Sequence, residues 1–232
     1  QRPCIWPCAE NRPRGSRAGV PHTVIPELVA LEHPDWLEDI HRAYVEAGAQ
    51  ILCANTFGAN REKLGRTGRT VEEVVPPSVE IARRAARGRA LVALDVGPTG
   101  QLLEPTGTLR FEEAVDIFAQ TVRAGVQAGA DLILIETMTD LQEARAALLA
   151  AKENSSLPVI VTMTYEERGR TFLGCDPASA ALTLEGMGAD AIGVNCSLGP
   201  REMPPLVREL TRWSTLPIAI KPNAGLADPG GA

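Results

Sequence analysis

Two patterns of hydrophobic and polar residues alternate along most of the chain, one typical of strands and the other of helices. Short apolar runs, typical of buried parallel strands, begin near residues 50, 90, 131, 158, 189 and 217. Between them, apolar residues recur every three to four positions, as they do in amphipathic helices. This alternation of strand and helix predicts right-handed βαβ units around a parallel sheet.

Local signals mark where several helices begin. A capping side chain, or a proline that suits the first turn, stands at Pro34, Thr70, Asp140 and Asp176. Glu73 and Glu143 follow two of these positions by three residues and predict capping boxes. Pro76-Pro77 predicts a break in the helix that begins after Thr70.

Polar residues gather where the apolar runs end. They are Asn55, Thr56, Asp95, Glu136, Thr137, Thr164, Asn195, Cys196, Lys221 and Asn223. A closed barrel builds its active site from the carboxyl ends of many strands, whereas an open doubly wound sheet usually carries a glycine-rich phosphate loop, and none occurs here. The pattern therefore predicts an α/β protein with an incomplete (β/α)8 TIM barrel of about six recognisable parallel strands.

Composition narrows the class of protein. The chain has 232 residues, 44% of them hydrophobic, which is enough for a substantial core. Its net charge of -6 argues against nucleic acid as a partner, because phosphate binding needs a concentrated basic face. No apolar run is long enough for a transmembrane helix and no signal peptide is recognisable, so no membrane partner and a cytoplasmic location are expected.

Residues 1–30 differ from the rest because prolines and arginines interrupt any periodic face, and we expect this segment to be irregular. Residues 31–232 then form the barrel domain. Cys4 and Cys8 could bind a metal, although their proline-rich setting offers no scaffold. Cys196 ends a strand, where a thiolate could act as a nucleophile or a metal ligand; a small buried hydrophobe is the alternative.

Five motifs together give the chain a family resemblance. They are Asn55-Thr56-Phe57-Gly58-Ala59-Asn60-Arg61, Asp95-Val96-Gly97-Pro98-Thr99-Gly100, Ile135-Glu136-Thr137-Met138-Thr139-Asp140, Gly193-Val194-Asn195-Cys196 and Lys221-Pro222-Asn223-Ala224-Gly225-Leu226. In this order the chain resembles the homocysteine S-methyltransferase family, and most of all the homocysteine-binding module of cobalamin-dependent methionine synthases. The resemblance implies a barrel that binds homocysteine and transfers a methyl group to its sulfur, giving methionine.

The resemblance also implies a zinc site made of three cysteine thiolates, of which Cys196 matches one. Zinc lowers the pKa of a bound thiol, so the catalytic group would be the metal site itself and no general base would be needed. The family's adjacent cysteine pair on the last strand is absent before Ala232, and its first-strand motif is absent from residues 1–30. We therefore expect a partial barrel that is truncated before its last strand.

Substrate contacts follow from the same resemblance. Asn55, Thr56 and Phe57 are expected near the amino acid, and Glu136 is expected to bind its ammonium group. A buried carboxylate without a charged group beside it is costly, which favours a binding role for Glu136, although it could instead cap a loop or helix. Asn195 is expected at the substrate site mainly to orient the loop that carries Cys196.

Other functions stay open from the residues alone. Lys221 ends a strand, where a desolvated lysine could form a Schiff base as in an aldolase. An inactive or partner-binding barrel fragment is a further alternative, since two zinc ligands are missing. The methyl donor implied by the resemblance is a methylcobalamin or methyltetrahydrofolate system on another domain or subunit, with betaine or a sulfonium compound as alternatives.

Overall fold

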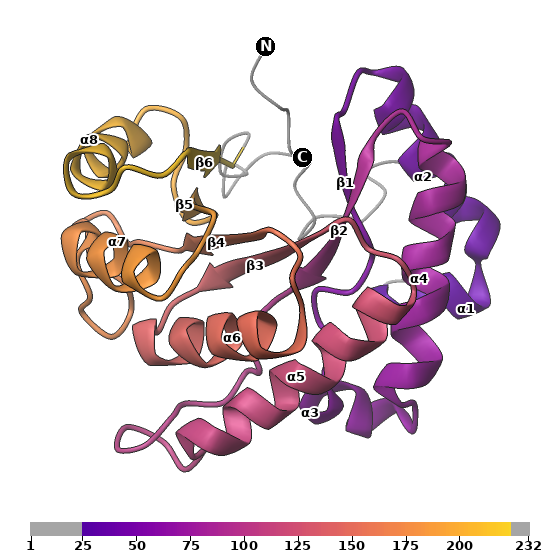
Figure 1. The fold of residues 1–232 in the computed structure, drawn as a ribbon, viewed down its shortest axis with the longest axis horizontal. Coiled ribbons are helices and arrows are strands. Elements are labelled where there is room, and N and C mark those ends of the chain that lie inside the picture. Colours follow the sequence, from indigo (N-terminus) through magenta and orange to yellow (C-terminus); the bar gives the residue numbers. More distant parts are fainter. Residues whose placement is uncertain (1–24, 224–232) are drawn as a thin grey trace, which may run out of the picture.

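The computed structural model describes residues 25–223, which form a curved sheet of six parallel strands with helices packed along its outer face (Figure 1). The strands are β1 (Ile51–Cys53), β2 (Leu91–Val96), β3 (Leu132–Met138), β4 (Val159–Met163), β5 (Ala191–Asn195) and β6 (Ile218–Lys221). Each strand pairs in parallel with the one that follows it in the chain. The sheet is thus a curled half-barrel, which confirms the predicted incomplete (β/α)8 barrel.

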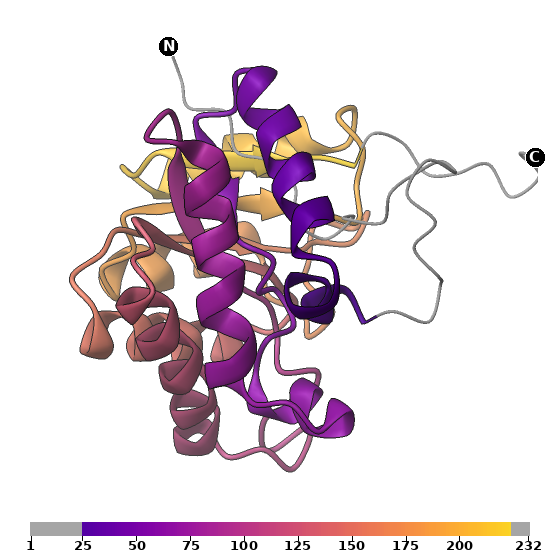
Figure 2. The ribbon, with the colours of Figure 1, turned by 90° about the vertical axis from the view of Figure 1, so that its right-hand side faces the viewer.

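Helices alternate with these strands in the order that the sequence predicts. They are η1 (Pro26–Leu28), α1 (Val29–Glu32), α2 (Pro34–Glu46), α3 (Arg61–Leu64), η2 (Gly65–Thr67), α4 (Val71–Ala86), α5 (Phe111–Gln127), α6 (Leu141–Asn154), α7 (Pro177–Gly186) and α8 (Met203–Trp213). Figure 2 shows α2 lying beside α4, so the first helices form an outer layer. Helical structure begins at Pro26, inside the range that the sequence predicts to be irregular, whereas Cys4 and Cys8 lie outside the described residues. Within 25–223, no helix has the length and apolar composition that a membrane span requires.

Strands β1 to β5 bury most of their residues on both faces, as parallel strands covered by helices do, whereas β6 is only partly buried. The outer face packs against the helices in one large apolar core. The inner, concave face has its own smaller cluster, formed by Ile51, Cys53, Ala93, Leu132 and Leu134. Cys53 is buried within this inner cluster.

The predicted break at Pro76-Pro77 is wrong, because α4 runs without interruption from Val71 to Ala86. Each interior proline removes a helix hydrogen bond and costs about 3 kcal/mol. One face of α4 nevertheless buries Val74, Val75 and Val79 completely. Burial of each valine contributes about 1.5–3 kcal/mol, so packing against the sheet offsets the local cost.

The two predicted capping boxes have different outcomes. Thr70 accepts a hydrogen bond from the Glu73 amide while the Glu73 carboxylate accepts one from Thr70 N, which confirms the first. Asp140 does cap α6, but it accepts from Gln142 N. Glu143 instead turns to the loop after β2, where Thr99 binds it. The second box is therefore wrong, because a tertiary partner takes the glutamate.

Candidate functional site

A layer of buried polar side chains lies on the inner face of the sheet, at the carboxyl ends of the strands. Side chains alternate between the two faces of a strand, so Asp95 and Glu136 face inward like Ala93 and Leu134, two residues before them. The layer contains Asn55, Asp95, Glu136, Thr162, Asn195 and Lys221, all of which are at least nine-tenths buried. The strand ends that the sequence singles out are thus brought together on one concave face.

Asn195 connects three strand ends through one side chain. Its Oδ1 accepts hydrogen bonds from Thr137 N at 2.9 Å and from Thr162 Oγ1 at 2.8 Å. Its Nδ2 donates to Thr137 Oγ1 at 2.8 Å and lies 3.5 Å from Cys196 Sγ. The amide therefore fixes the position of Cys196 relative to β3 and β4, as an orienting residue would.

The backbone beside this amide is strained. Thr137, Cys196 and Ser197 have positive φ angles of 62°, 58° and 54°. Such a conformation is uncommon outside glycine and costs of order 1–3 kcal/mol for each residue. It turns the half-buried Cys196 away from the strand direction while its N–H donates to Lys221 O at 3.2 Å. Strain of this kind is characteristic of functional sites.

Glu136 and Lys221 form an ion pair across the concave face. Glu136 Oε2 accepts a hydrogen bond from Lys221 Nζ, and the two side chains are 0% and 5% exposed. Glu136, which is expected to bind an ammonium group, thus already lies beside the ammonium group of Lys221. Its Oε1 is buried and has no hydrogen-bond partner among the described residues.

The predicted residues after β1 are held by local contacts. Asn55 Nδ2 donates to Pro26 O at 2.5 Å, and Thr56 Oγ1 both donates to Asp95 O and accepts from Asp95 N, at 2.8 and 3.0 Å. The half-buried ring of Phe57 packs so close to Gly97 that a Cβ there would lie 2.5 Å from it. These contacts fix the loop on the β1 side of the face.

A group of charged residues near Phe57 is missing from the sequence-based prediction. The Lys63 ammonium lies 5.2 Å from the centre of the Phe57 ring, and burial lowers the pKa of Lys63 against the opposing effect of nearby carboxylates, Glu27 foremost. Burial also raises the pKa of Glu143, which accepts hydrogen bonds from Thr99 N and Oγ1 at 2.7 and 2.6 Å. The only sequence signal was the glycine-rich turn at Gly97–Gly100, which places Thr99 beside the strand end.

The thiols of the described residues do not form a zinc site. Among residues 25–223, no group of three or more His, Cys, Asp and Glu side chains could hold a metal ion. Cys53 is enclosed in the inner apolar cluster, and Cys175 lies in the loop after β4, where burial raises its pKa to about 11. Cys196 is thus one thiol at the strand ends without the two further cysteine ligands that the resemblance implies.

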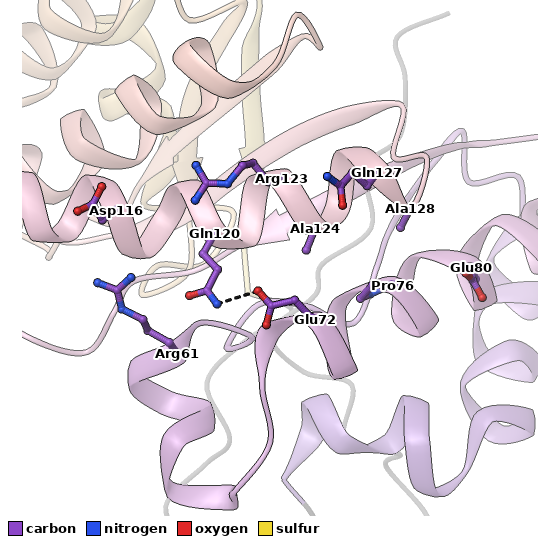
Figure 3. A pocket seen from close by; sticks show the side chains of 10 residues that line it. All are labelled: Arg61, Glu72, Pro76, Glu80, Asp116, Gln120, Arg123, Ala124, Gln127 and Ala128. Atoms are coloured by element: carbon purple, nitrogen blue, oxygen red, sulfur yellow. Dashed lines mark hydrogen bonds between the residues drawn. The ribbon is translucent and has the colours of Figure 1, made fainter.

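A surface hollow of about 950 Å³ lies elsewhere, between α3, α4 and α5 (Figure 3). Its lining has both signs of charge and comprises Arg61, Glu72, Pro76, Glu80, Asp116, Gln120, Arg123, Ala124, Gln127 and Ala128. Glu72 accepts a hydrogen bond from Gln120 across it. None of the predicted site residues lines this hollow, so the strand ends remain the candidate site.

Comparison with known proteins gives a consistent family and fold. The family model for homocysteine S-methyltransferase matches residues 14–232. The methionine synthases of Mycobacterium leprae and Mycobacterium tuberculosis are 33% and 34% identical over 213 and 214 residues. These alignments cover 86% of this chain but 18% of each relative, so the chain spans less than a fifth of their length.

Solved structures share the architecture. The metallated form of the homocysteine methyltransferase MmuM from Escherichia coli matches with a TM-score of 0.79 at 22% identity, over 89% of this chain and 79% of that one. The carboxyl transferase domain of Rhizobium etli pyruvate carboxylase, with pyruvate, matches with a TM-score of 0.51 at 19% identity, over 79% and 32%. At these identities the likeness concerns the fold.

Proposed function

The chain belongs to the homocysteine S-methyltransferase family, and on that premise we propose that it binds homocysteine at the carboxyl ends of its strands. A methyl group is transferred there to the homocysteine thiol to give methionine. The homocysteine-binding unit in this proposal is the barrel of residues 31–232. The observation that supports it most is that Glu136 and Asn195 lie in one buried polar layer, with the half-buried thiol of Cys196 next to Asn195.

Each predicted residue has a role in this proposal that its surroundings support. Glu136 binds the substrate ammonium group through its open oxygen, Oε1. Asn195 holds the Cys196 loop in place, so the amino acid meets a preorganised face. Asn55, Thr56 and Phe57 form the wall on the β1 side that contacts the amino acid, because their loop is fixed against Pro26 and Asp95.

Within residues 25–223, Cys196 is the one residue that we assign to zinc binding. We assign Cys196 as one zinc ligand, with the remaining ligands supplied from outside residues 25–223, because the described residues do not form a zinc site by themselves. The binding and orienting roles of Glu136 and Asn195 do not depend on the metal.

The methyl donor is assigned to a methylcobalamin or methyltetrahydrofolate system carried by another domain or subunit. The support is the likeness to two methionine synthases, each of which is much longer than the stretch that this chain matches. Methyl transfer needs donor and acceptor in line and in contact, so the donor must reach the concave face at the strand ends.

A second candidate function is that of a partner-binding barrel without catalytic activity. It is favoured by the lack, within residues 25–223, of a cluster that could hold a metal ion. An aldolase that uses Lys221 as a Schiff-base nucleophile is not favoured. Lys221 is paired with the buried carboxylate of Glu136, which stabilises the charged amine, and a charged amine is not nucleophilic.

Measurements of zinc content and homocysteine affinity distinguish the methyltransferase from the partner-binding barrel. Joined to the segment that supplies the remaining ligands, the protein is expected to show bound zinc by elemental analysis that is lost in Cys196→Ser, and calorimetry is expected to show weaker homocysteine binding in that variant. Cys175→Ser is the matched control, since this thiol lies in the loop after β4, and it is expected to retain both properties.

Two outcomes would count against the methyltransferase. A chain that binds neither zinc nor homocysteine supports the partner-binding barrel. Zinc that is unchanged in Cys196→Ser removes Cys196 as a ligand, whatever the affinity for homocysteine.

A further inference from the structure

Two glycines, Gly58 in the loop after β1 and Gly97 in the turn after β2, are closely approached by side chains. Neither glycine has a φ angle in the left-handed region, so the backbone conformation does not require glycine at these positions. A Cβ at Gly58 would overlap the carboxylate of Glu27, and a Cβ at Gly97 would overlap the ring of Phe57. Glycine is therefore required at both positions by the space that a neighbouring side chain occupies.

Glu27 reaches the loop after β1 from η1. Its Oε1 accepts a hydrogen bond from Gly58 N at 2.8 Å, across 31 positions of sequence. Hydrogen bonds to a carboxylate are stronger than those between neutral groups. The carbonyl of the preceding residue, Pro26, accepts from Asn55 Nδ2. η1 therefore holds the loop at two points, one on each side of Phe57.

Phe57 is held in place by its backbone and by its ring. Gly97 N donates a hydrogen bond to Phe57 O at 2.9 Å, and the ring packs against Gly97. The Lys63 ammonium of α3 lies 5.2 Å from the centre of the ring, which is within the range of a cation–π interaction. Both contacts restrict the orientation of the ring.

Glu27 also acts on the charge of Lys63. Burial lowers the pKa of Lys63, and Glu27 is the foremost of the carboxylates that oppose this effect. The negative charge of Glu27 thus favours the ammonium form of Lys63, which is the form that an aromatic face attracts. One carboxylate therefore supports Phe57 in two ways, through the backbone of the next residue and through the cation near its ring.

The segment that carries Glu27 has other anchors to the fold. Ala30, in α1, is 3% exposed and belongs to an apolar cluster with Leu37 and Ile81. Pro26 keeps its hydrogen bond to Asn55 whatever residue stands at position 27, because the acceptor is a backbone carbonyl. Loss of the Glu27 carboxylate should therefore leave η1 and α1 in place and change mainly the loop after β1.

We propose that Glu27 is a positioning residue for homocysteine, because it fixes the Phe57 ring as a wall of the substrate site through Gly58 N and Lys63. The inference rests on the proposed function and extends it, since Glu27 acts through Phe57 and does not itself contact the substrate. It adds a residue that lies outside the strand ends and outside the five motifs that carry the family resemblance.

The orientation of the Phe57 ring can be measured without substrate. The chain has four phenylalanines, so fluorine NMR of the chain labelled with 4-fluorophenylalanine resolves few signals, and Phe57→Leu identifies the one from Phe57. Glu27→Ala is expected to shift or broaden this signal. Glu32→Ala, which changes an exposed glutamate at the end of α1, is the matched control and should leave all signals unchanged.

Homocysteine affinity measures the consequence for the substrate. With the protein joined to the segment that supplies the remaining zinc ligands, calorimetry is expected to show roughly threefold to tenfold weaker homocysteine binding in Glu27→Ala, about the effect of one net hydrogen bond. Glu27→Gln keeps an acceptor for Gly58 N but loses the charge near Lys63, so its loss should be smaller. Lys63→Met removes the cation and should also lose part of the affinity.

A double-mutant cycle tests whether Glu27 acts through Phe57. Phe57→Ala removes the ring, so adding Glu27→Ala to it is expected to weaken homocysteine binding by less than about twofold further. Urea unfolding of the same variants separates this effect from stability. A lower free energy of unfolding in Glu27→Ala with unchanged homocysteine affinity would make Glu27 a structural anchor only and would overturn the inference.

The outcomes distinguish this inference from the function on which it rests. A wild-type protein that does not bind homocysteine overturns both. A protein that binds homocysteine overturns the positioning role alone if Glu27→Ala leaves the Phe57 signal unchanged. The same conclusion follows if Glu27→Ala weakens homocysteine binding by an equal factor with and without the Phe57 ring.

Discussion

At the scale of single residues, Asn195 has the densest set of contacts in the candidate site. Four polar atoms from Thr137, Thr162 and Cys196 lie within hydrogen-bonding range of its amide. Its own backbone carbonyl accepts from Thr164 Oγ1 at 3.1 Å. One side chain thus keeps the ends of β3, β4 and β5 in a fixed relation.

Replacement of this amide should be costly. Asn195→Ala leaves Thr137 N and the buried Thr162 hydroxyl without an acceptor, so we expect a loss of roughly 2–4 kcal/mol in the free energy of unfolding. Urea unfolding measures it, with Asn154→Ala at the end of α6 as the control. If the two variants lose equal stability, Asn195 is not the connector that its contacts indicate.

His41 is a second residue whose burial has a measurable consequence. It lies in α2 with 1% of its surface exposed, and neither ring nitrogen has a hydrogen-bond partner among the described residues. Burial lowers the pKa of its imidazole from 6.5 to about 4. The unfolded chain therefore binds more protons than the folded one between these pH values, and the folded state loses stability as the pH falls through this window.

Substitution of His41 by leucine should remove this pH dependence of the free energy of unfolding. The shift corresponds to about 3 kcal/mol at most, so the wild-type free energy of unfolding should drop by up to this amount from neutral pH to a pH near 4, beyond the change seen in His41→Leu. Denaturant unfolding at several pH values measures how the free energy of unfolding changes with pH in the wild type and in His41→Leu. His33→Leu serves as the control. Parallel slopes for the wild type and His41→Leu would refute the assignment.

The sequence predicts the site residues to the extent that they depend on strand ends. Glu136, Asn195 and Cys196 follow apolar runs, and parallel strands bring such positions together. The pairing of Glu136 with Lys221 was not predictable, because it joins residues 85 positions apart through the curvature of the sheet. The same holds for Glu143 and Thr99, whose contact replaces a local cap with a tertiary one.

At the scale of elements, the backbone of β6 leaves no room for a side chain at Gly193 of β5. A Cβ at this position would lie 1.9 Å from Ala219 O, a backbone atom that cannot move without the strand. Glycine is therefore required here by the packing of the two strands, and the position of Cys196 three residues later depends on it.

Two glycine substitutions should have opposite effects. Gly193→Ala is expected to cost about 1–3 kcal/mol or more, because β5 and β6 must separate to accept the methyl group. Gly186→Ala, at the end of α7 with nothing within 4 Å of the added carbon, is expected to gain about 0.5–1 kcal/mol. Thermal unfolding of both variants is the measurement; a stable Gly193→Ala would contradict the close approach.

Periodicity predicts the existence and order of the elements well, because both strand faces and one helix face are buried. It is weaker at their ends and at interruptions. The continuity of α4 through Pro76-Pro77 depends on packing against β1 and β2, which no local pattern reports. The short β1 likewise ends at Cys53 because its following residues turn to bind Pro26 and Asp95.

At the scale of the whole molecule, β1 and β6 each have one neighbouring strand among the described residues. Ile220 on β6 is 46% exposed, and Ile218 and Ala219 before it are only partly buried. Exposed apolar edge strands favour pairing between molecules.

A charge on this strand should reduce self-association. In analytical ultracentrifugation the wild-type chain is expected to gain mass with concentration and Ile220→Lys to gain less, with little change in the unfolding midpoint. Leu182→Lys, which changes an exposed leucine on α7, is the control and should leave association unchanged. If both substitutions act equally, general surface hydrophobicity is responsible and not the strand edge.

The strand order has a consequence for how the molecule is made. Each strand lies beside the one synthesised immediately before it. A ribosome that releases the chain from its amino end therefore delivers every new strand and helix to a sheet edge that already exists, and no earlier segment must wait for a distant one. The fold can grow by one unit at a time, and the buried polar layer at the strand ends is completed when Lys221 arrives opposite Glu136.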